Sequence, residues 1–380
     1  MHPSSQHHAN GGGALSNDAE PRDTSSPTIN RRHALVGLAA ATGVAAVGGA
    51  GVAEASGWFD TQRLTSSRFT DRFEQLYGRH DGFRRNHAKG LAATGTFASS
   101  GAGAEVSKAA ILGRGTVPVV ARFSMSGSVP DAADQPGTVR GLGILFEHPD
   151  GDQWRTAMVN LPVFPDSTPQ GFYDRLLASV PDPATGKPVP SAMSAFLAKH
   201  PETVAAMAAI RASPPSTGFA DSTFRGLNAF LATNAAGATV PIRWAAVPVD
   251  PIASAPLPTG PPDALFDALI ERVERGPVSW RLLLTVAQPG DPTHDATLAW
   301  PAPRRTIDAG LITIDAVATE APGNARDVNF DPLILPAGLG ASDDPLPRAR
   351  SAVYARSFER RSREPKSPSR VDVAEVNHGH

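Results

Sequence analysis

The 380-residue chain contains no cysteine. This absence excludes disulfide bonds, thiolate nucleophiles, iron–sulfur clusters and zinc sites built from cysteine. Tyrosine is also scarce, so any chemistry that needs a phenol must use Tyr77, Tyr173 or Tyr354. The formal net charge is only -2 at pH 7, which gives no reason to expect a nucleic acid or an anionic membrane surface as partner.

Apolar residues make up 41% of the chain, enough to bury a substantial core. The 35 glycines and 36 prolines are spread along the sequence, which indicates many loops between short elements. No repeat of fixed period is visible, and no linker divides the chain after its N-terminal region. One domain is therefore the economical interpretation.

The N-terminal region has the composition of a targeting segment. Residues 1–28 are polar and aperiodic, which predicts disorder. Residues 29–55 combine Arg31 and Arg32, a weakly apolar Ala/Gly/Val stretch and the small-x-small sequence Ala53-Glu54-Ala55. This combination predicts a signal peptide for the twin-arginine export machinery, hence a periplasmic or otherwise exported protein. The alternative is an uncleaved anchor helix of about 20 residues.

Residues 56–363 alternate between strand-like and helix-like patterns. Helices are expected within residues 59–82, 168–178, 190–212, 261–275 and 344–361. Eight strands are expected at residues 90–97, 116–123, 141–146, 154–160, 223–233, 239–248, 279–287 and 311–318. This order predicts an α+β fold, a closed antiparallel eight-stranded β-barrel decorated with helices, because closure removes exposed sheet edges. Residues 364–380 are charged and rich in Ser and Pro, which predicts a flexible tail.

Two distant segments carry reactive side chains. The first places His87 among basic residues directly before a predicted strand, in Arg84-Arg85-Asn86-His87-Ala88-Lys89-Gly90. The second has Tyr354 four residues after Arg350 on a predicted helix, so both side chains lie on one face and the arginine can stabilise a phenolate. A histidine and such a tyrosine are what a haem iron with a phenolate ligand needs on its two sides.

The ordered set of motifs resembles the haem catalases. The set consists of Arg84–Gly90, Arg122-Phe123-Ser124, Val139-Arg140-Gly141, Pro162-Val163-Phe164, Phe330-Asp331-Pro332, Arg350 and Tyr354. The resemblance implies the haem catalase core fold over residues 58–362. Given its length, we expect neither the wrapping segment nor the C-terminal helical domain of a typical catalase, and in this the chain resembles the small catalase-related peroxidases. The implied cofactor is haem b.

The resemblance implies catalytic roles for two residues. His87 would be the acid/base, since one imidazole can take a proton from one peroxide oxygen and return it to the other. Ser124 would orient His87 through a hydrogen bond. Tyr354 would be the iron ligand, and a phenol must ionise to bind Fe(III) well. An ordinary core or surface position is the alternative for each residue.

Further residues would hold the cofactor. Arg84, Arg122 and Arg361 match positions that pair with haem propionates, and Arg350 accompanies the ligand. Each of these arginines could instead be a solvated strand or helix end. Phe172 matches an aromatic residue that packs on the haem plane, although phenylalanine is common in cores.

One position departs from the family pattern. The distal asparagine of catalases lies three residues before the proline of Pro162-Val163-Phe164, and Val159 stands there. Asn160 is next, but adjacent side chains on a strand point to opposite faces. Either a bulge brings Asn160 into the pocket or the pocket lacks the amide. A missing amide would disfavour hydrogen peroxide disproportionation and favour organic peroxides.

These features support a haem-dependent peroxidase that reduces organic peroxides, with hydrogen peroxide as a further candidate. The alternatives are a true catalase and, in a different class, a non-catalytic barrel that binds haem or lipid. A purely structural barrel is the simplest case. The electron donor and the preferred peroxide are not specified by the sequence. The oligomeric state is also open, and a homo-oligomer is compatible with it.

Overall fold

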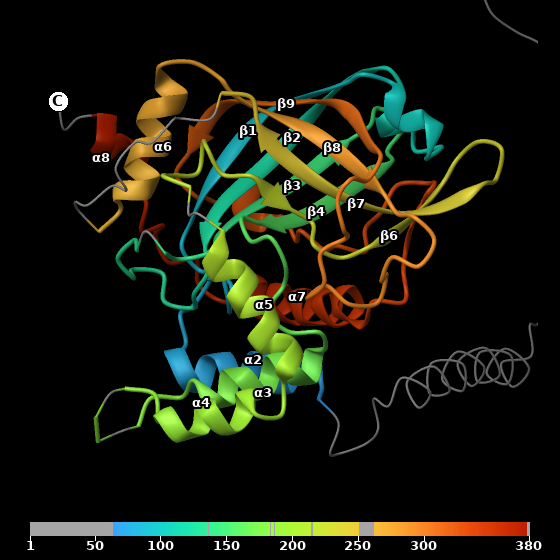
Figure 1. The fold of residues 1–380 in the computed structure, drawn as a ribbon. Helices are drawn as coiled ribbons and strands as arrows, with labels where there is room; N and C mark the ends of the chain where they lie inside the picture. Colours follow the sequence, from blue (N-terminus) through green and yellow to red (C-terminus); the bar gives the residue numbers. More distant parts are fainter. Residues whose placement is uncertain are drawn as a thin grey trace, which may run out of the picture. The chain divides into compact units, whose positions relative to one another are not determined.

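A closed antiparallel sheet forms the centre of the structure (Figure 1). The computed structural model describes residues 64–377 apart from 136, 183, 186, 214–215 and 251–261. The predicted disordered start, the predicted signal peptide and residues 378–380 lie outside the described residues. None of the described helices is both long enough and apolar enough to cross a membrane.

Eight strands close the barrel through pairing of β7 with β8, in the order β1-β2-β3-β4-β5-β7-β8-β9 and back to β1. Two further strands, β6 and β10, continue the sheet beside β7. The predicted closed antiparallel eight-stranded barrel is therefore confirmed. The strands are β1 (Gly90–Ser99), β2 (Gly115–Met125), β3 (Arg140–Glu147), β4 (Gln153–Val159), β5 (Phe224–Arg225), β6 (Phe230–Thr233), β7 (Thr239–Pro248), β8 (Val278–Val286), β9 (Thr306–Ala318) and β10 (Leu339–Ala341).

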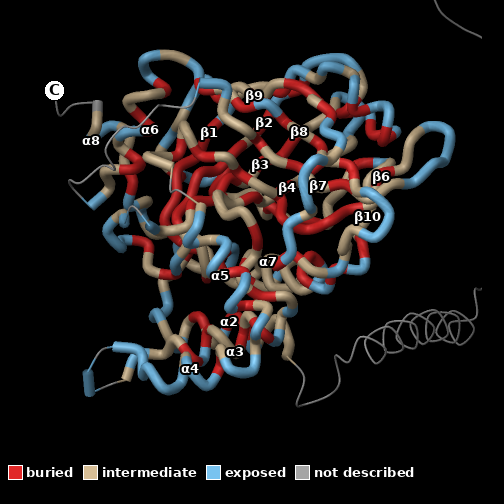
Figure 2. Tube along the Cα trace, in the orientation of Figure 1, coloured by how far each residue is buried: buried red, intermediate tan, exposed pale blue. Residues whose placement is uncertain are grey.

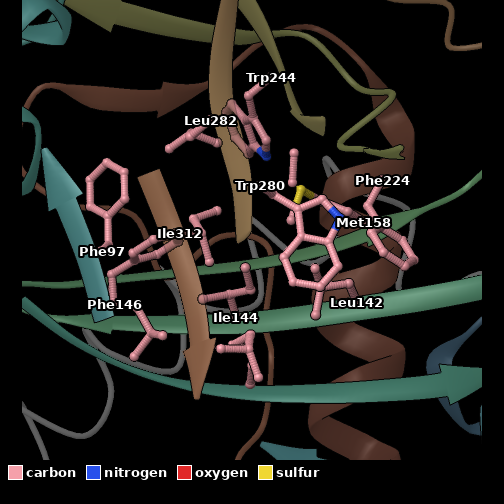
Figure 3. Close-up of a cluster of buried hydrophobic side chains, with 14 of the residues drawn as sticks. Phe97, Leu142, Ile144, Phe146, Met158, Phe224, Trp244, Trp280, Leu282 and Ile312 are labelled. Carbon is pink, nitrogen blue, oxygen red and sulfur yellow. The ribbon is translucent and has the colours of Figure 1, made fainter. Parts of the chain in front are cut away.

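The barrel interior is filled with large apolar side chains (Figure 3). Strands alternate between interior and exterior residues, so Leu142, Ile144 and Phe146 of β3 enter the core while Gly141 and Gly143 face outward. Trp244 and Trp280 are buried, and each indole N–H donates to an oxygen, at 2.9 Å and 3.1 Å respectively. Buried residues accordingly concentrate in the strands (Figure 2).

Helices pack against the outside of the barrel. The long helix α7 runs beneath the sheet, and α2 and α3 pack on it (Figure 1). Phe69 and Phe73 of α2 meet Tyr173 of α3 in a separate apolar cluster. Helices α6 and α8 lie together at another side of the barrel. The α-helices are α2 (Ser66–Tyr77), α3 (Pro169–Ala178), α4 (Pro190–Leu197), α5 (Pro201–Ala212), α6 (Ala264–Glu274), α7 (Pro345–Arg363) and α8 (Val373–Asn377).

Two predicted elements are interrupted. The strand expected at 223–233 leaves the sheet at Gly226–Asn228, where Leu227 has a φ of 60°. The helix expected at 190–212 is divided into α4 and α5, because Pro201 lacks an N–H and its ring disfavours helical geometry at His200.

The prediction of a flexible tail is wrong for residues 364–377. Glu364 accepts a hydrogen bond of 2.9 Å from the buried Arg85, and Val371 is 1% exposed within the main core. The short helix α8 then packs on α6. Charge composition alone conceals this anchoring, because it does not show that Arg85 needs a buried carboxylate partner.

Candidate active site

A cavity of about 580 Å³ lies between the outer face of strands β2–β4 and the helix α7. Its volume is in the range of small-molecule and cofactor sites. All eight residues predicted for the site line it: Arg84, His87, Ser124, Arg122, Phe172, Arg350, Tyr354 and Arg361. The fold therefore brings together segments that lie more than 250 positions apart in the sequence.

Small residues make room for this cavity on the sheet. Gly141 and Gly143 of β3, and Ala157 of β4, face outward opposite the packed interior. A Cβ atom on Gly141 would lie 2.9 Å from the Ser124 hydroxyl and 3.1 Å from His87 Nδ1. Larger side chains here would displace His87, so the glycine at this point is a requirement of the site.

His87 is held rigidly on both its backbone and its side chain. Its backbone φ is 55°, a value uncommon for residues other than glycine. The Asn86 side-chain oxygen accepts from the His87 N–H at 3.0 Å, and Arg122 donates to the His87 carbonyl at 2.9 Å. On the ring, Nδ1 lies 3.1 Å from the Ser124 hydroxyl, as the predicted orienting role of Ser124 requires. This contact leaves Nε2 as the ring atom able to exchange a proton with a substrate.

The surroundings keep His87 neutral. Burial, followed by the charges of Arg122, Arg350 and Arg84, lowers the pKa of His87 from 6.5 to about 3. A neutral imidazole with a free lone pair can accept a proton across the whole physiological range. The site thus holds a base, not an imidazolium.

The register of β4 shows which side chain stands where the family pattern has the distal asparagine. Val159 pairs with Gly141 without a bulge and lines the cavity. Asn160 instead accepts a hydrogen bond of 2.8 Å from the backbone N–H of Arg140, at the end of the strand pair. The wall beside His87 is therefore apolar where the family pattern has an asparagine.

Tyr354 enters the cavity from α7. The helix begins at the capping residue Asp344, whose side chain accepts from the Leu346 N–H at 2.9 Å, and Pro345 occupies its first turn. Arg350 lies one turn before Tyr354, 3.5 Å from its hydroxyl, with the guanidinium 5.7 Å from the ring centre. The predicted pairing of Arg350 with Tyr354 is thus present.

Arg350 is held in place by a series of hydrogen bonds that the sequence did not predict. The guanidinium donates to the Asn228 side-chain oxygen at 2.7 Å and to the Ala157 carbonyl at 2.9 Å. The Asn228 amide in turn donates to Asp344 at 2.8 Å. Asp344 before a proline carries a helix-start signal, but nothing in the sequence around Asn228 indicates this role. Asn228 occupies the interruption between β5 and β6.

Three arginines converge at one edge of the cavity around a buried glutamate. Glu320 accepts two hydrogen bonds from Arg122, at 2.7 Å and 2.9 Å, and lies 3.4 Å from Arg84. Arg361 donates to the backbone carbonyls of Arg326 and Val328. No pattern in the sequence marks Glu320 as part of the site, because a single acidic residue after a strand is usually solvated.

The three arginines differ in how many of their N–H donors are already hydrogen-bonded within the protein. Each guanidinium has five N–H donors. Arg122 donates to Glu320 and to the carbonyls of His87 and Ala88. Arg84 donates to Glu320 and to the carbonyls of Ala325 and Val328, whereas Arg361 donates to two backbone carbonyls. Arg361 therefore retains the most capacity to bind an external carboxylate and Arg84 somewhat more than Arg122, a difference that the sequence could not show.

Phe172 lines the cavity from α3. Its ring stacks on Phe164 with centres 6.0 Å apart, and the Arg175 guanidinium lies 5.3 Å from its centre. These contacts fix the ring without a ligand. The position is compatible with the predicted packing role and with an ordinary apolar wall.

The profile of the Catalase family matches residues 82–366 of the chain. A catalase-related peroxidase from Synechococcus elongatus is 37% identical over 333 residues, which cover 87% of this chain and 95% of the relative. The chain belongs to the catalase family. Another catalase-related peroxidase, from Mycolicibacterium paratuberculosis, is 31% identical over 79% of this chain and 95% of its own length. The resemblance read from the sequence motifs is confirmed.

Solved catalase structures share the fold at low sequence identity. Catalase A from Saccharomyces cerevisiae is 20% identical, with a TM-score of 0.64 over 79% of this chain and 65% of that one. A bacterial catalase gives 19% identity and a TM-score of 0.63, over 80% of this chain and 62% of its own. This chain therefore spans less than two thirds of these larger catalases.

Catalases are haem-dependent, and the donor set of this cavity suits a haem. Tyr354 supplies a phenol oxygen on one side, and His87 with Ser124 lies on the other. Arg84, Arg122 and Arg361 together carry three positive charges, and the negative charge of Glu320 offsets one of them. The two positive charges that remain match the two negative charges of the haem propionates. The residues therefore fit the group that the family uses.

The same cluster determines part of the stability of the protein. Burial would raise the pKa of Glu320, but the charge and hydrogen bonds of Arg122 and the charge of Arg84 outweigh it and lower the pKa from 4.5 to about 2. Because this pKa is lower in the folded chain, the stabilisation is complete above about pH 4.5 and is lost as the pH falls toward 2.

Replacing Glu320 by glutamine should lower the free energy of unfolding of the haem-free protein by about 3 kcal/mol at pH 7, since it leaves buried arginines uncompensated. Urea unfolding at several pH values measures this difference. The difference in the free energy of unfolding between the variant and the wild type should become smaller below pH 4.5. The control Glu359→Gln removes an exposed carboxylate beside Arg356 and should change stability little. A gap that stays constant down to pH 3 would contradict the assignment.

Proposed function

We propose that this protein is a haem b-dependent peroxidase that reduces organic peroxides to alcohols with electrons from an external donor. Haem b is favoured because the chain has no cysteine for covalent attachment or for a thiolate ligand. The haem, when bound, would supply the redox chemistry of O–O cleavage. The single observation that carries the proposal is the pairing of His87 with Ser124 opposite Tyr354, beside an apolar Val159.

The contribution of the chain to this reaction is proton transfer and positioning. With a proton on Nδ1 donated to Ser124, His87 Nε2 carries a lone pair and accepts the peroxide proton. The same atom then returns the proton to the departing oxygen, so the imidazole ends each cycle as it began. In total, ROOH, two electrons and two protons give ROH and water. The fixed φ and the hydrogen bonds of His87 hold Nε2 in place between these steps.

Tyr354 and the arginines would hold the cofactor. Arg350 directs a positive charge at the Tyr354 hydroxyl, the oxygen that would bind ferric iron. Arg84 and Arg361 have free donors for propionates, while Arg122 acts through Glu320 and the His87 carbonyl. Apolar residues such as Val159 and Phe172 line the same cavity, and their side chains disfavour water beside the reacting groups.

The substitution Val159→Asn tests the preference for organic peroxides. An amide at this position should add one hydrogen bond to hydrogen peroxide and raise oxygen evolution about tenfold relative to turnover of cumene hydroperoxide. Oxygen-electrode and peroxide-consumption assays on the haem-loaded protein give the two rates. The control Val159→Leu keeps the wall apolar and should not raise oxygen evolution. A wild type that already evolves oxygen rapidly and ignores cumene hydroperoxide is a true catalase, and the proposal fails.

A further inference from the structure

A row of residues crosses the outer face of the sheet from His87 to the strand β5. Ser124 pairs with Gly141, Gly141 with Val159, and Val159 with Arg225. Residues directly opposite one another in antiparallel strands present their side chains on the same face. Arg225 therefore shares the face of Ser124, the residue that contacts His87, and it lines the same cavity.

Arg225 has no anionic partner among the described residues. Its guanidinium makes one long hydrogen bond, to the Thr223 carbonyl at 3.4 Å, and no carboxylate of the described residues lies within ion-pair distance. Arg175, also on the cavity wall, is by contrast paired with Asp166 at 2.8 Å. Arg225 is half-buried, and burial lowers its pKa with no carboxylate to offset the effect.

The cavity wall contributed by α5 and by the segment after β4 is largely apolar, with Leu161, Phe164, Met207 and Ile210. Arg211 of α5 also lines the cavity, but it is exposed, whereas Arg225 is half-buried. Binding sites of this kind use a few polar groups to orient a largely apolar ligand. A guanidinium with free donors in such a wall is suited to a carboxylate, which it can bind through two parallel hydrogen bonds.

The row also sets the length of the ligand. It crosses three strand boundaries at about 4.8 Å each, which places Arg225 and Ser124 about 14 Å apart along the sheet. The side chain of Arg225 can shorten this separation but not close it. A carboxylate bound there must therefore be separated by several carbon atoms from a peroxide group at His87. A peroxy acid, whose peroxide is part of the carboxyl group itself, is too short.

We propose that Arg225 binds the carboxylate of a fatty-acid hydroperoxide whose peroxide group lies against His87. This proposal rests on the proposed peroxidase function and names its substrate class. The hydrocarbon between the two groups would lie along Val159 and the apolar wall. Arg225 is then a specificity residue that selects acids over neutral peroxides, and it takes no part in proton transfer.

Kinetics of the haem-loaded protein with linoleic acid hydroperoxide and its methyl ester test the selection. In the wild type, kcat/KM should be at least about tenfold higher for the acid. Arg225→Gln should lower kcat/KM for the acid by about 10- to 100-fold, mainly through KM, and leave the ester unchanged. Arg225→Lys should retain part of the preference. The control Arg281→Gln changes an exposed strand arginine outside the cavity and should have no effect.

Equilibrium binding separates this proposal from the peroxidase function. Calorimetric titration with laurate, which carries no peroxide, should show binding to the wild type and binding at least tenfold weaker to Arg225→Gln, while methyl laurate should bind both equally. Laurate binding that depends on Arg225 in a protein without peroxidase activity would support the carboxylate site and refute the proposed function. The assignment of Arg225 would be overturned if the wild type had the same kcat/KM for the acid and the ester. It would also be overturned if the wild type and Arg225→Gln bound laurate equally well.

Discussion

Replacement of His87 by asparagine should lower kcat/KM for an organic peroxide by about 10²- to 10⁴-fold and leave haem content intact. The loss follows from the removal of Nε2, the proton-exchanging atom of the cavity. Asparagine is the appropriate substitute because it is among the non-glycine residues that tolerate the φ of 55° found at this position. Stopped-flow kinetics on the haem-loaded variant measure the rate, and the absorption spectrum measures haem content.

The pH profile is a second readout of the same residue. Because the pKa of His87 is lowered to about 3, the imidazole stays neutral above about pH 4, and kcat/KM of the wild type should show no loss of activity near pH 6.5. The control Ser124→Ala removes only the orienting hydroxyl and should cost less than His87→Asn. A variant that keeps half of the wild-type rate, or a wild-type profile that falls near pH 6.5, would exclude His87 as the base.

Alternation of residues along the strands made the barrel predictable. Strands β2, β3 and β8 carry either a large apolar run or alternating burial, and a short turn separates β3 from β4. The same alternation explains why the site could be found only in part. Gly141, Gly143 and Ala157 face outward and leave a hollow, but a small residue in a sequence does not reveal what lies opposite it.

Contacts between distant segments account for most of what sequence reasoning missed. Arg122 and Arg350 were both predicted as site residues. Glu320 accepts hydrogen bonds from Arg122, and Asn228 accepts one from Arg350. A buried arginine must find acceptors, but the sequence does not state which carboxylate or amide provides them. The tail was misjudged for the same reason, since Glu364 satisfies the buried Arg85.

The two backbone irregularities mark the site more directly. His87 and Leu227 are the non-glycine residues with positive φ within residues 64–377 outside the gaps, and both line the cavity. Such conformations cost free energy and persist where surrounding contacts enforce them. At His87 the contacts come from Asn86 and Arg122. At Leu227 a hydrogen bond of 2.7 Å from the Asn228 N–H to the Gly226 carbonyl closes the turn, and the Asn228 side chain then reaches Arg350. The chain thus leaves regular geometry at the points where it positions a functional side chain.

The substitution Tyr354→Phe should weaken haem binding by more than about 100-fold, since it removes the ligand itself and not only a supporting contact. Titration of haem into the haem-free variant, followed by absorbance, measures the affinity. The high-spin ferric spectrum expected of the wild type should be lost or markedly changed, and peroxidase activity should fall with it. A variant with unchanged affinity and spectrum would show that Tyr354 is not the ligand.

The loss should be specific to the cofactor because little else depends on the Tyr354 hydroxyl. Its hydrogen bond from Arg350 is long, at 3.5 Å, and Arg350 keeps Asn228 and Ala157 as acceptors when that oxygen is removed. The free energy of unfolding of the haem-free protein should therefore change by less than about 1 kcal/mol. Tyr173→Phe is the matched control, since Tyr173 is buried, accepts a hydrogen bond of 3.3 Å from Arg72 and does not line the cavity. That variant should bind haem as the wild type does, so a common effect of both substitutions would point to folding, and an effect of Tyr354→Phe alone would assign the iron ligand.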